Sequence, residues 1–147
     1  MKKALNEVKV IFDSKSENES LARYIAASFC ATFGPTVDIL ADVKCTVSEA
    51  VTNCVVHAYK DTVGKIYMTL RAFDDNKVSI SIRDRGCGID DVSLAKTPLY
   101  TTDPLGERSG MGFPIMESLS DKLRISSKKG LGTTVTMYFD LKKEVNK

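Results

Sequence analysis

The spacing of hydrophobic positions near the start of the chain predicts one strand followed by a helix. Residues 7–12 alternate in polarity, which is typical of a half-buried strand. Ser16 and Glu19 have the spacing of a capping box, in which two side chains bond free backbone N–H groups at a helix start. The helix is expected to end at Gly34-Pro35. The residues expected to face inward, at the helical period, are Leu21, Ile25, Ser28, Phe29 and Phe33.

The remaining periodic segments predict two more helices and four more strands. A second helix is expected from residue 36 or 37 to 58, and residues 65–83 alternate about a central turn, as a hairpin does. A short helix at about 111–119 and strands near 122–127 and 133–141 follow. Each strand has one apolar face. The predicted fold is therefore α+β, a two-layer α/β sandwich whose mixed, mostly antiparallel sheet carries helices on one face.

Composition and charge fit a single soluble domain spanning residues 1–147. The net charge of +2 is too small to indicate a nucleic-acid partner. No apolar run approaches the roughly 18–20 residues needed to cross a bilayer, so we expect a cytoplasmic protein without a membrane partner. The four cysteines form no C-x-x-C pair and the chain has one histidine, so the sequence predicts no zinc site.

Candidate chemistry begins on the second predicted helix. Glu49, Asn53 and His57 follow one another at intervals of four residues and form a polar stripe opposite the hydrophobic arc. The predicted hairpin is followed at once by D-x-G-x-G, with Asp84, Gly86 and Gly88. Two glycines one residue apart let a backbone approach a flat ligand, and a carboxylate just ahead can accept a hydrogen bond from an amino group.

Further glycines flank a long segment without periodicity. Residues 84–110 are rich in Gly, Pro, Thr and Asp, and so long an irregular stretch inside one domain is usually functional or mobile. Gly110 and Gly112 open the short helix, whose free N–H groups would suit phosphate. Gly132 and Thr133 precede the last strand. Taken singly, each of these features is typical of a turn or a solvated surface.

The order of these motifs resembles one nucleotide-binding superfamily. It includes gyrase, the ninety-kilodalton heat-shock chaperone, histidine kinases and MutL, and the resemblance covers residues 18–140. The alternative phosphate loop, G-x-x-x-x-G-K-[ST], is absent from the sequence. Residues 18–23, 47–53 and 107–113 further resemble the anti-sigma F factors of spore-forming bacteria, which are serine protein kinases. The resemblance implies a Bergerat-type ATP-binding fold, with ATP or ADP and Mg²⁺ as ligands.

The resemblance also implies a role for each site residue. Asn53 would hold Mg²⁺, and Glu49 would act as the general base. Asp84 would bind the adenine amino group. The other residues implied to contact nucleotide are Gly86, Gly88 and Thr133 at the base, Gly110, Gly112 and Arg108 at the phosphates, and Thr101 and Thr102 in the flap before the short helix. Tyr100 and Asp103 depart from the phenylalanine and the basic residue that we expect in this flap.

The implied partners are proteins. By resemblance, the chain binds and inhibits a sporulation sigma factor and phosphorylates an anti-anti-sigma protein on serine. Arg23 would contact both partners, although an outward arginine on a helix is as often simply solvated. A homodimer is also implied. Three alternatives are open: a general-stress type of anti-sigma kinase, a non-catalytic module that binds the sigma factor in an ATP-dependent manner, and an ATP-hydrolysing clamp as in gyrase. The clamp ranks last, since 147 residues leave no room for a transducer domain.

Overall fold

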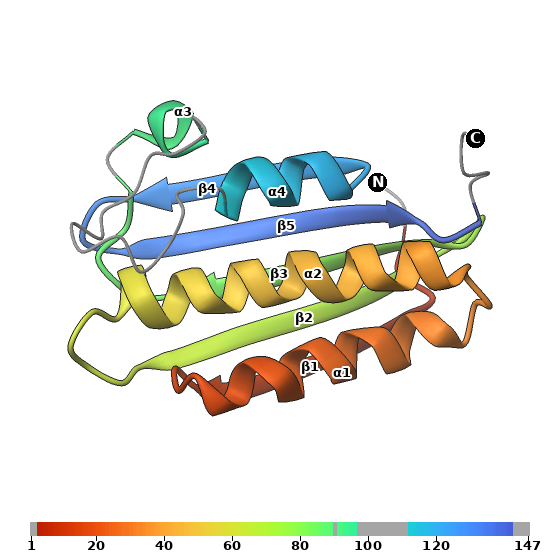
Figure 1. The fold of residues 1–147 in the computed structure, drawn as a ribbon, viewed down its shortest axis with the longest axis horizontal. Coiled ribbons are helices and arrows are strands. Elements are labelled where there is room, and N and C mark those ends of the chain that lie inside the picture. The colour runs from red at the N-terminus through yellow and green to blue at the C-terminus, as the bar shows by residue number, and fades with distance from the viewer. Residues whose placement is uncertain (1–2, 90, 97–111, 143–147) are drawn as a thin grey trace.

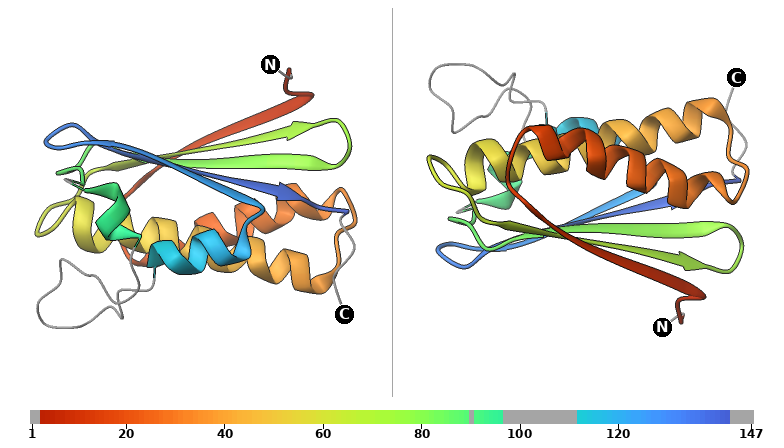
Figure 2. Two further views of the ribbon diagram at one scale, coloured as in Figure 1. Left: turned by 90° about the horizontal axis from the view of Figure 1, so that it is seen from above. Right: turned by 90° about the horizontal axis from the view of Figure 1, so that it is seen from below.

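The computed structural model describes residues 3–89, 91–96 and 112–142. The elements in chain order are β1 Asn6–Asp13, α1 Glu17–Ala31, α2 Val37–Asn53, the π-helical turn η1 Cys54–Ala58, β2 Lys65–Phe73, β3 Lys77–Asp84, α3 Val92–Ala95, α4 Gly112–Leu119, β4 Lys122–Lys128 and β5 Gly132–Asp140. Helices α1, α2 and α4 lie side by side over one face of the sheet (Figures 1 and 2). The predicted two-layer sandwich is confirmed.

The sheet has five strands in the order β1-β2-β3-β5-β4, and all four pairings between them are antiparallel. The prediction of a mixed sheet is therefore wrong for the described strands. The physical reason is the order of the strands: β3 and β4 run in the same direction, but β5 lies between them and runs opposite to both, so no two neighbouring strands are parallel. In this register the last residue of β3, Asp84, pairs with Ile66 of β2 on one side and Thr133 of β5 on the other.

The core lies between α2 and the sheet. The alternation in β2 buries Ile66, Met68 and Leu70 completely, and the hydrophobic arc of α2 buries Val43 and Val47 against them. Burial of each such side chain stabilises the fold by about 1.5–3 kcal/mol. None of the described helices covers the other face of the sheet, as Figure 2 shows. The second helix is thus fixed on the sheet by one side and presents its polar stripe on another.

The first helix differs from its prediction at both its start and its inward face. The Ser16 side chain makes no capping hydrogen bond, so the expected capping box does not form. Of the residues expected to face inward, Ile25, Phe29 and Phe33 pack against the core, whereas Leu21 is 51% exposed and Ser28 is also exposed. The buried positions of α1 are small residues: Ala22, Ala26, Ala27 and Cys30. These small side chains let α1 lie close to α2. This close packing, more than the size of the hydrophobic side chains, determines which face of α1 is most deeply buried.

The second helix is confirmed, with an altered final turn. Its N-cap is Thr36, whose side chain accepts a hydrogen bond of 3.2 Å from the Ile39 N–H. The helix ends as the π-helical turn η1, in which the Tyr59 N–H donates to the Cys54 carbonyl five residues back. The predicted hairpin, short helix and last two strands are also present. None of the described helices has the length and apolar character needed to cross a bilayer.

Candidate functional site

The polar stripe of α2 meets the first residue of α4. A Cβ atom placed on Gly112 would lie 3.2 Å from Asn53 Oδ1 and 3.4 Å from Glu49 Oε2. Both side chains are half-buried at this contact. Three residues taken from two separate motifs thus lie together, as the order of the motifs led us to expect. An amide, a carboxylate and the start of a helix form one small polar site.

Asp84 lies at the end of β3 with 5% of its surface exposed. Its Oδ1 accepts hydrogen bonds from the Gly86 N–H at 2.9 Å and the Thr133 N–H at 3.2 Å. Its Oδ2 lies 3.5 Å from the Cys54 thiol, a weak donor. Burial raises the pKa of Asp84 above its ordinary value, and the three hydrogen bonds oppose that rise. Oδ2 retains capacity to accept a stronger donor such as an amino group.

The glycines of the D-x-G-x-G loop allow close contact between parts of the chain itself. A Cβ on Gly86 would lie 2.2 Å from the Ala58 carbonyl oxygen, and one on Gly88 would lie 2.2 Å from that of Lys128. Gly88 also has a φ of +77°, which other residues rarely adopt. The Cβ side of both glycines is therefore filled by protein. This close contact docks the loop against η1 and the β4–β5 turn, and the contact of Gly86 and Gly88 with a nucleotide base stays a prediction.

Two residues that the sequence did not single out hold this loop. The Tyr59 hydroxyl donates to the Lys65 carbonyl and accepts from the Arg85 N–H, both at 2.7 Å. Ser127 Oγ accepts from the Ile89 N–H at 2.8 Å and lies 2.7 Å from the Thr133 hydroxyl. Ser127 pairs with Thr133 in the sheet register, so hairpin pairing could have indicated it, whereas nothing in the sequence marks Tyr59.

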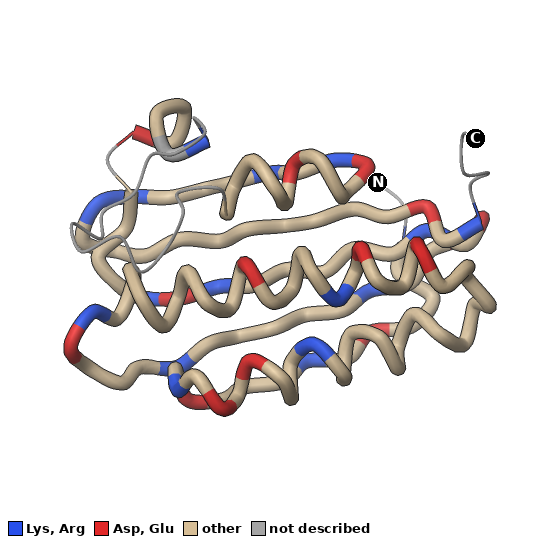
Figure 3. The backbone as a smooth tube through the Cα atoms, viewed as in Figure 1, with Lys and Arg blue, Asp and Glu red and all other residues tan. Residues whose placement is uncertain are grey.

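The three helices on this side of the sheet carry more acidic than basic residues. Helices α1, α2 and α4 carry six acidic residues (Glu17, Glu19, Asp38, Asp42, Glu49 and Glu117) and two basic ones (Arg23 and Lys44) (Figure 3). Among the described residues, no cluster of three or more His, Cys, Asp or Glu could hold a metal. A hydrated Mg²⁺ needs few protein ligands, so the Asn53 amide suits it when phosphate oxygens supply the rest. The site therefore fits a magnesium-bound nucleotide better than a bare anion.

Several residues expected at the site lie outside the described part of the chain. These are Thr101, Thr102, Arg108 and Gly110, together with Tyr100 and Asp103 of the expected flap. Their roles remain predictions.

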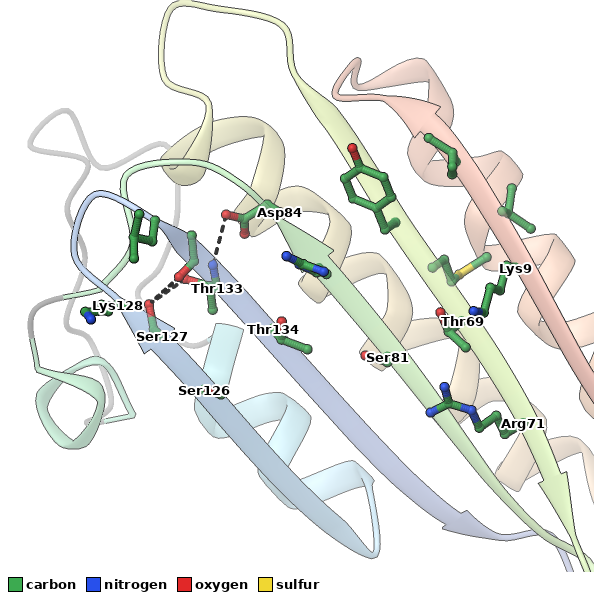
Figure 4. Close-up of a pocket in the computed structure, with 17 residues that line it drawn as sticks. Lys9, Thr69, Arg71, Ser81, Asp84, Ser126, Ser127, Lys128, Thr133 and Thr134 are labelled. Carbon is green, nitrogen blue, oxygen red and sulfur yellow. Dashed lines mark hydrogen bonds between the residues drawn. The ribbon is translucent and has the colours of Figure 1, made fainter. Parts of the chain in front are cut away.

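A separate hollow of about 740 Å³ lies on the sheet face that the helices leave uncovered. Figure 4 shows Lys9, Thr69, Arg71 and Ser81 lining it, with Asp84 at one end. Glu49, Asn53 and Gly112 do not border this hollow. It is distinct from the polar site on α2.

Comparison with known proteins shows the family to which this chain belongs. The model of the histidine kinase-like ATPase domain matches residues 12–139. The anti-sigma F factor of Caldanaerobacter subterraneus subsp. tengcongensis is 49% identical over 133 residues, which cover 90% of this chain and 92% of that protein. This chain belongs to the anti-sigma F factors, within the histidine kinase-like ATPases. The Bacillus subtilis anti-sigma F factor is 45% identical over 139 residues, 94% of each chain.

Solved structures support the fold assignment of this anti-sigma F family member. The crystal structure of the RsbU and RsbW domains of Rv1364c from Mycobacterium tuberculosis aligns with a TM-score of 0.66 at 22% identity, covering 92% of this chain and 32% of that one. The histidine kinase domain of a blue-light activated histidine kinase from Erythrobacter litoralis EL346 aligns with a TM-score of 0.56 at 17% identity, covering 84% and 61%. At these identities the likeness establishes the fold alone.

Arg23 lies on α1 of this anti-sigma F family member, within a small polar cluster. Its guanidinium is 3.6 Å from Glu19 Oε1 and 5.3 Å from the centre of the Tyr24 ring. Glu19 also accepts a hydrogen bond from the Ser48 hydroxyl, which belongs to α2 and precedes Glu49. The carboxylate that we expected to cap the helix thus bridges α1 and α2. Arg23 is half-buried.

Proposed function

We propose that the chain is an anti-sigma factor with protein serine kinase activity. It binds and inhibits a sporulation RNA polymerase sigma factor, and with ATP it phosphorylates an anti-anti-sigma protein on serine. Membership of the anti-sigma F family supports the partners. One observation carries the chemistry: Glu49, Asn53 and Gly112 lie together, although 58 residues of sequence separate Asn53 from Gly112. A carboxylate beside a metal-binding amide and a helix start has the parts that phosphoryl transfer needs.

Each residue has a distinct task in this proposal. Asn53 would hold the magnesium ion, which would supply positive charge to neutralise the phosphates. Glu49, one helical turn earlier, accepts the proton from the serine hydroxyl as that oxygen attacks phosphorus. Gly112, which has no side chain, lets the start of α4 lie close to Asn53 and Glu49, and the α4 N-terminus directs N–H groups toward the phosphates. Because phosphoryl transfer depends on position and charge, displacing Glu49 or Asn53 slows it steeply.

The base-binding end of the site lies at Asp84. Oδ2 accepts the adenine amino group, while Oδ1 stays bonded to the backbone of Gly86 and Thr133. The depth of Asp84 excludes water from this contact and strengthens it. A guanine base presents a carbonyl at the same position, which a carboxylate repels. The arrangement therefore favours ATP and ADP over guanine nucleotides.

The partner-binding part of the proposal involves Arg23. Its guanidinium can form a paired hydrogen bond with an acidic side chain of either protein partner. We also propose that the protein acts in the cytoplasm as a homodimer. Analytical ultracentrifugation tests the dimer, and a single species of monomer mass at micromolar concentration would exclude it.

The decisive experiment combines partner capture with phosphate transfer. The tagged protein is incubated in lysate of sporulating cells with Mg-ATP or Mg-ADP, and the bound proteins are identified and their phosphosites mapped. We expect a sigma factor with ATP and a small protein labelled on serine. The Glu49→Ala variant should still bind the sigma factor but should lose at least 100-fold in transfer rate, as expected for a lost general base.

Asp38→Ala is the matched control, because Asp38 is an exposed acid on the first turn of the same helix. It should transfer phosphate at the wild-type rate. Sigma binding without any labelled serine would contradict the kinase activity and favour a non-catalytic ATP-dependent module. Capture of neither partner would contradict the regulatory function.

A further inference from the structure

A buried thiol lies against the base-binding carboxylate. Cys54 opens the π-helical turn, is 4% exposed, and places Sγ 3.5 Å from Asp84 Oδ2. The π-helical turn begins directly after Asn53, the last residue of α2. One short stretch of backbone therefore presents a metal-binding amide and, at the next residue, a thiol directed at the carboxylate 30 residues further along the chain.

The two oxygens of Asp84 have unequal partners. Oδ1 accepts two backbone N–H groups, which are fixed by the loop and by β5. Oδ2 accepts the Cys54 S–H, the one side-chain donor that contacts it among the described residues. An oxygen that accepts one hydrogen bond retains a second lone pair. With its two oxygens held from different directions, the carboxylate plane cannot rotate freely about its terminal bond.

We propose that Cys54 is a positioning residue for base recognition: its thiol holds the Asp84 carboxylate so that the free lone pair of Oδ2 is directed at the purine amino group. This inference rests on the proposed nucleotide function. It assigns Cys54 no contact with the nucleotide itself. The thiol acts through Asp84. Loss of the thiol should therefore reduce the preference of the carboxylate for the amino group of adenine over the carbonyl group of guanine.

The geometry of the neighbouring side chains supports this role. The Tyr59 hydroxyl, at the end of the same turn, donates to the Lys65 carbonyl and accepts from the Arg85 N–H. Its single proton is therefore used away from Asp84. The Cys54 thiol is the described side-chain donor that is directed at the carboxylate.

The first test uses nucleotide-free protein and measures the Asp84 carboxyl by ¹³C NMR as pH is varied. Removing a hydrogen bond to the charged form raises an acid pKa. Cys54→Ala should therefore move the Asp84 titration to higher pH, while Cys54→Ser, which keeps a donor, should leave it near the wild-type position. Cys30→Ala is the matched control, because Cys30 is a fully buried thiol on α1 without a hydrogen bond to Asp84. It should leave the Asp84 titration unchanged.

The second test measures ADP and GDP binding by calorimetry across the same pH range. Cys54→Ala should weaken ADP binding about 2- to 10-fold, as for one lost hydrogen bond, and reduce the preference for ADP over GDP. Its acid limit of ADP binding should move to higher pH. Cys54→Ser should restore the preference, and Cys30→Ala should keep it even if its melting temperature falls.

The outcomes separate the two levels of the proposal. An unchanged Asp84 titration and an unchanged ADP preference in Cys54→Ala would overturn the positioning role while leaving nucleotide binding intact. Wild-type protein that binds neither nucleotide would overturn the proposed function and the role of Cys54 in it together. Equal losses in Cys54→Ala and Cys30→Ala would show a general effect of core packing and would also overturn the positioning role.

Discussion

Gly112 lies so close to Asn53 that a single added methyl group on the glycine would stand 3.2 Å from the amide oxygen. This distance joins the start of α4 to the polar stripe of α2 and sets the width of the site between them. It also means that the glycine is required for space and not for an unusual backbone angle, since Gly112 is not among the positions with positive φ.

We predict that Gly112→Ala lowers phosphate transfer by about 10-fold without lowering the melting temperature. The new methyl group displaces the Asn53 amide by a few tenths of an ångström, and small displacements of reacting groups are costly in rate. Alanine is otherwise the better helix former. Transfer assays and thermal melts measure the two effects. Ser118→Ala, on the exposed side of α4, is the control and should change neither.

Gly86→Ala should destabilise the fold by about 3 kcal/mol, the upper range for overpacking. Its Cβ would lie 2.2 Å from the Ala58 carbonyl oxygen, an atom of the backbone that cannot rotate away. Gly130→Ala provides the comparison. A Cβ there meets no atom within 4 Å, and its φ of +81° costs only the strain of about 1 kcal/mol. Urea denaturation measures both, and equal losses would show that the loop can move away from η1.

The two helix starts allow a paired prediction. Thr36→Ala removes the side chain that accepts the Ile39 N–H and should cost about 1 kcal/mol of unfolding free energy. Ser16→Ala should change the free energy by less than about 0.5 kcal/mol, because the Ser16 side chain makes no capping bond. If Ser16→Ala proved as costly as Thr36→Ala in chemical denaturation, the capping box expected from the sequence would form in solution after all.

Asp84→Asn should abolish nucleotide binding and yet leave the melting temperature at pH 7 equal to or above that of wild type. Burial raises the Asp84 pKa in the folded state, so the folded chain holds this proton more tightly than the unfolded chain. Ionisation therefore costs stability as pH rises from the ordinary value of 3.8 through the raised value. The advantage of the asparagine variant should shrink below that window. If the stability of Asp84→Asn relative to wild type were lower at pH 7 than at pH 3, the prediction would be contradicted.

Local patterns predicted much of the fold. The second helix and the hairpin at 65–83 carry long, regular periods, and both formed where expected. The first helix was harder, because its inward face is chosen by how closely it can approach α2. Leu21 is the larger hydrophobic residue, but Ala22 fits the close contact between α1 and α2. The hydrophobic pattern of one segment cannot show how closely it will approach another helix. The direction of each strand relative to its neighbours likewise depends on the order of the strands in the sheet. The alternation of polar and hydrophobic residues along one strand does not show that order.

The candidate site divides in the same way. Glu49, Asn53 and Asp84 belong to motifs with fixed spacing, so the sequence could name them. The positions of Cys54 and Tyr59 depend on the π-helical turn, which adds a residue to the last turn of the helix and redirects its end. No spacing rule predicts that turn, and the contacts that depend on it could be found only in the folded chain.

The 17 residues of α2 carry both the stripe that packs on the sheet and the stripe that bears Glu49 and Asn53. Because the helix is rigid, a tilt that changes the packing of one face also moves the side chains of the other. Enlarging or shrinking Val47 in the interior would therefore shift the reacting groups on the opposite flank. Substitutions in the core-facing side of α2 are therefore coupled to the positions of Glu49 and Asn53. Variants selected for higher thermal stability should often show an altered rate of phosphate transfer even when every polar residue is retained.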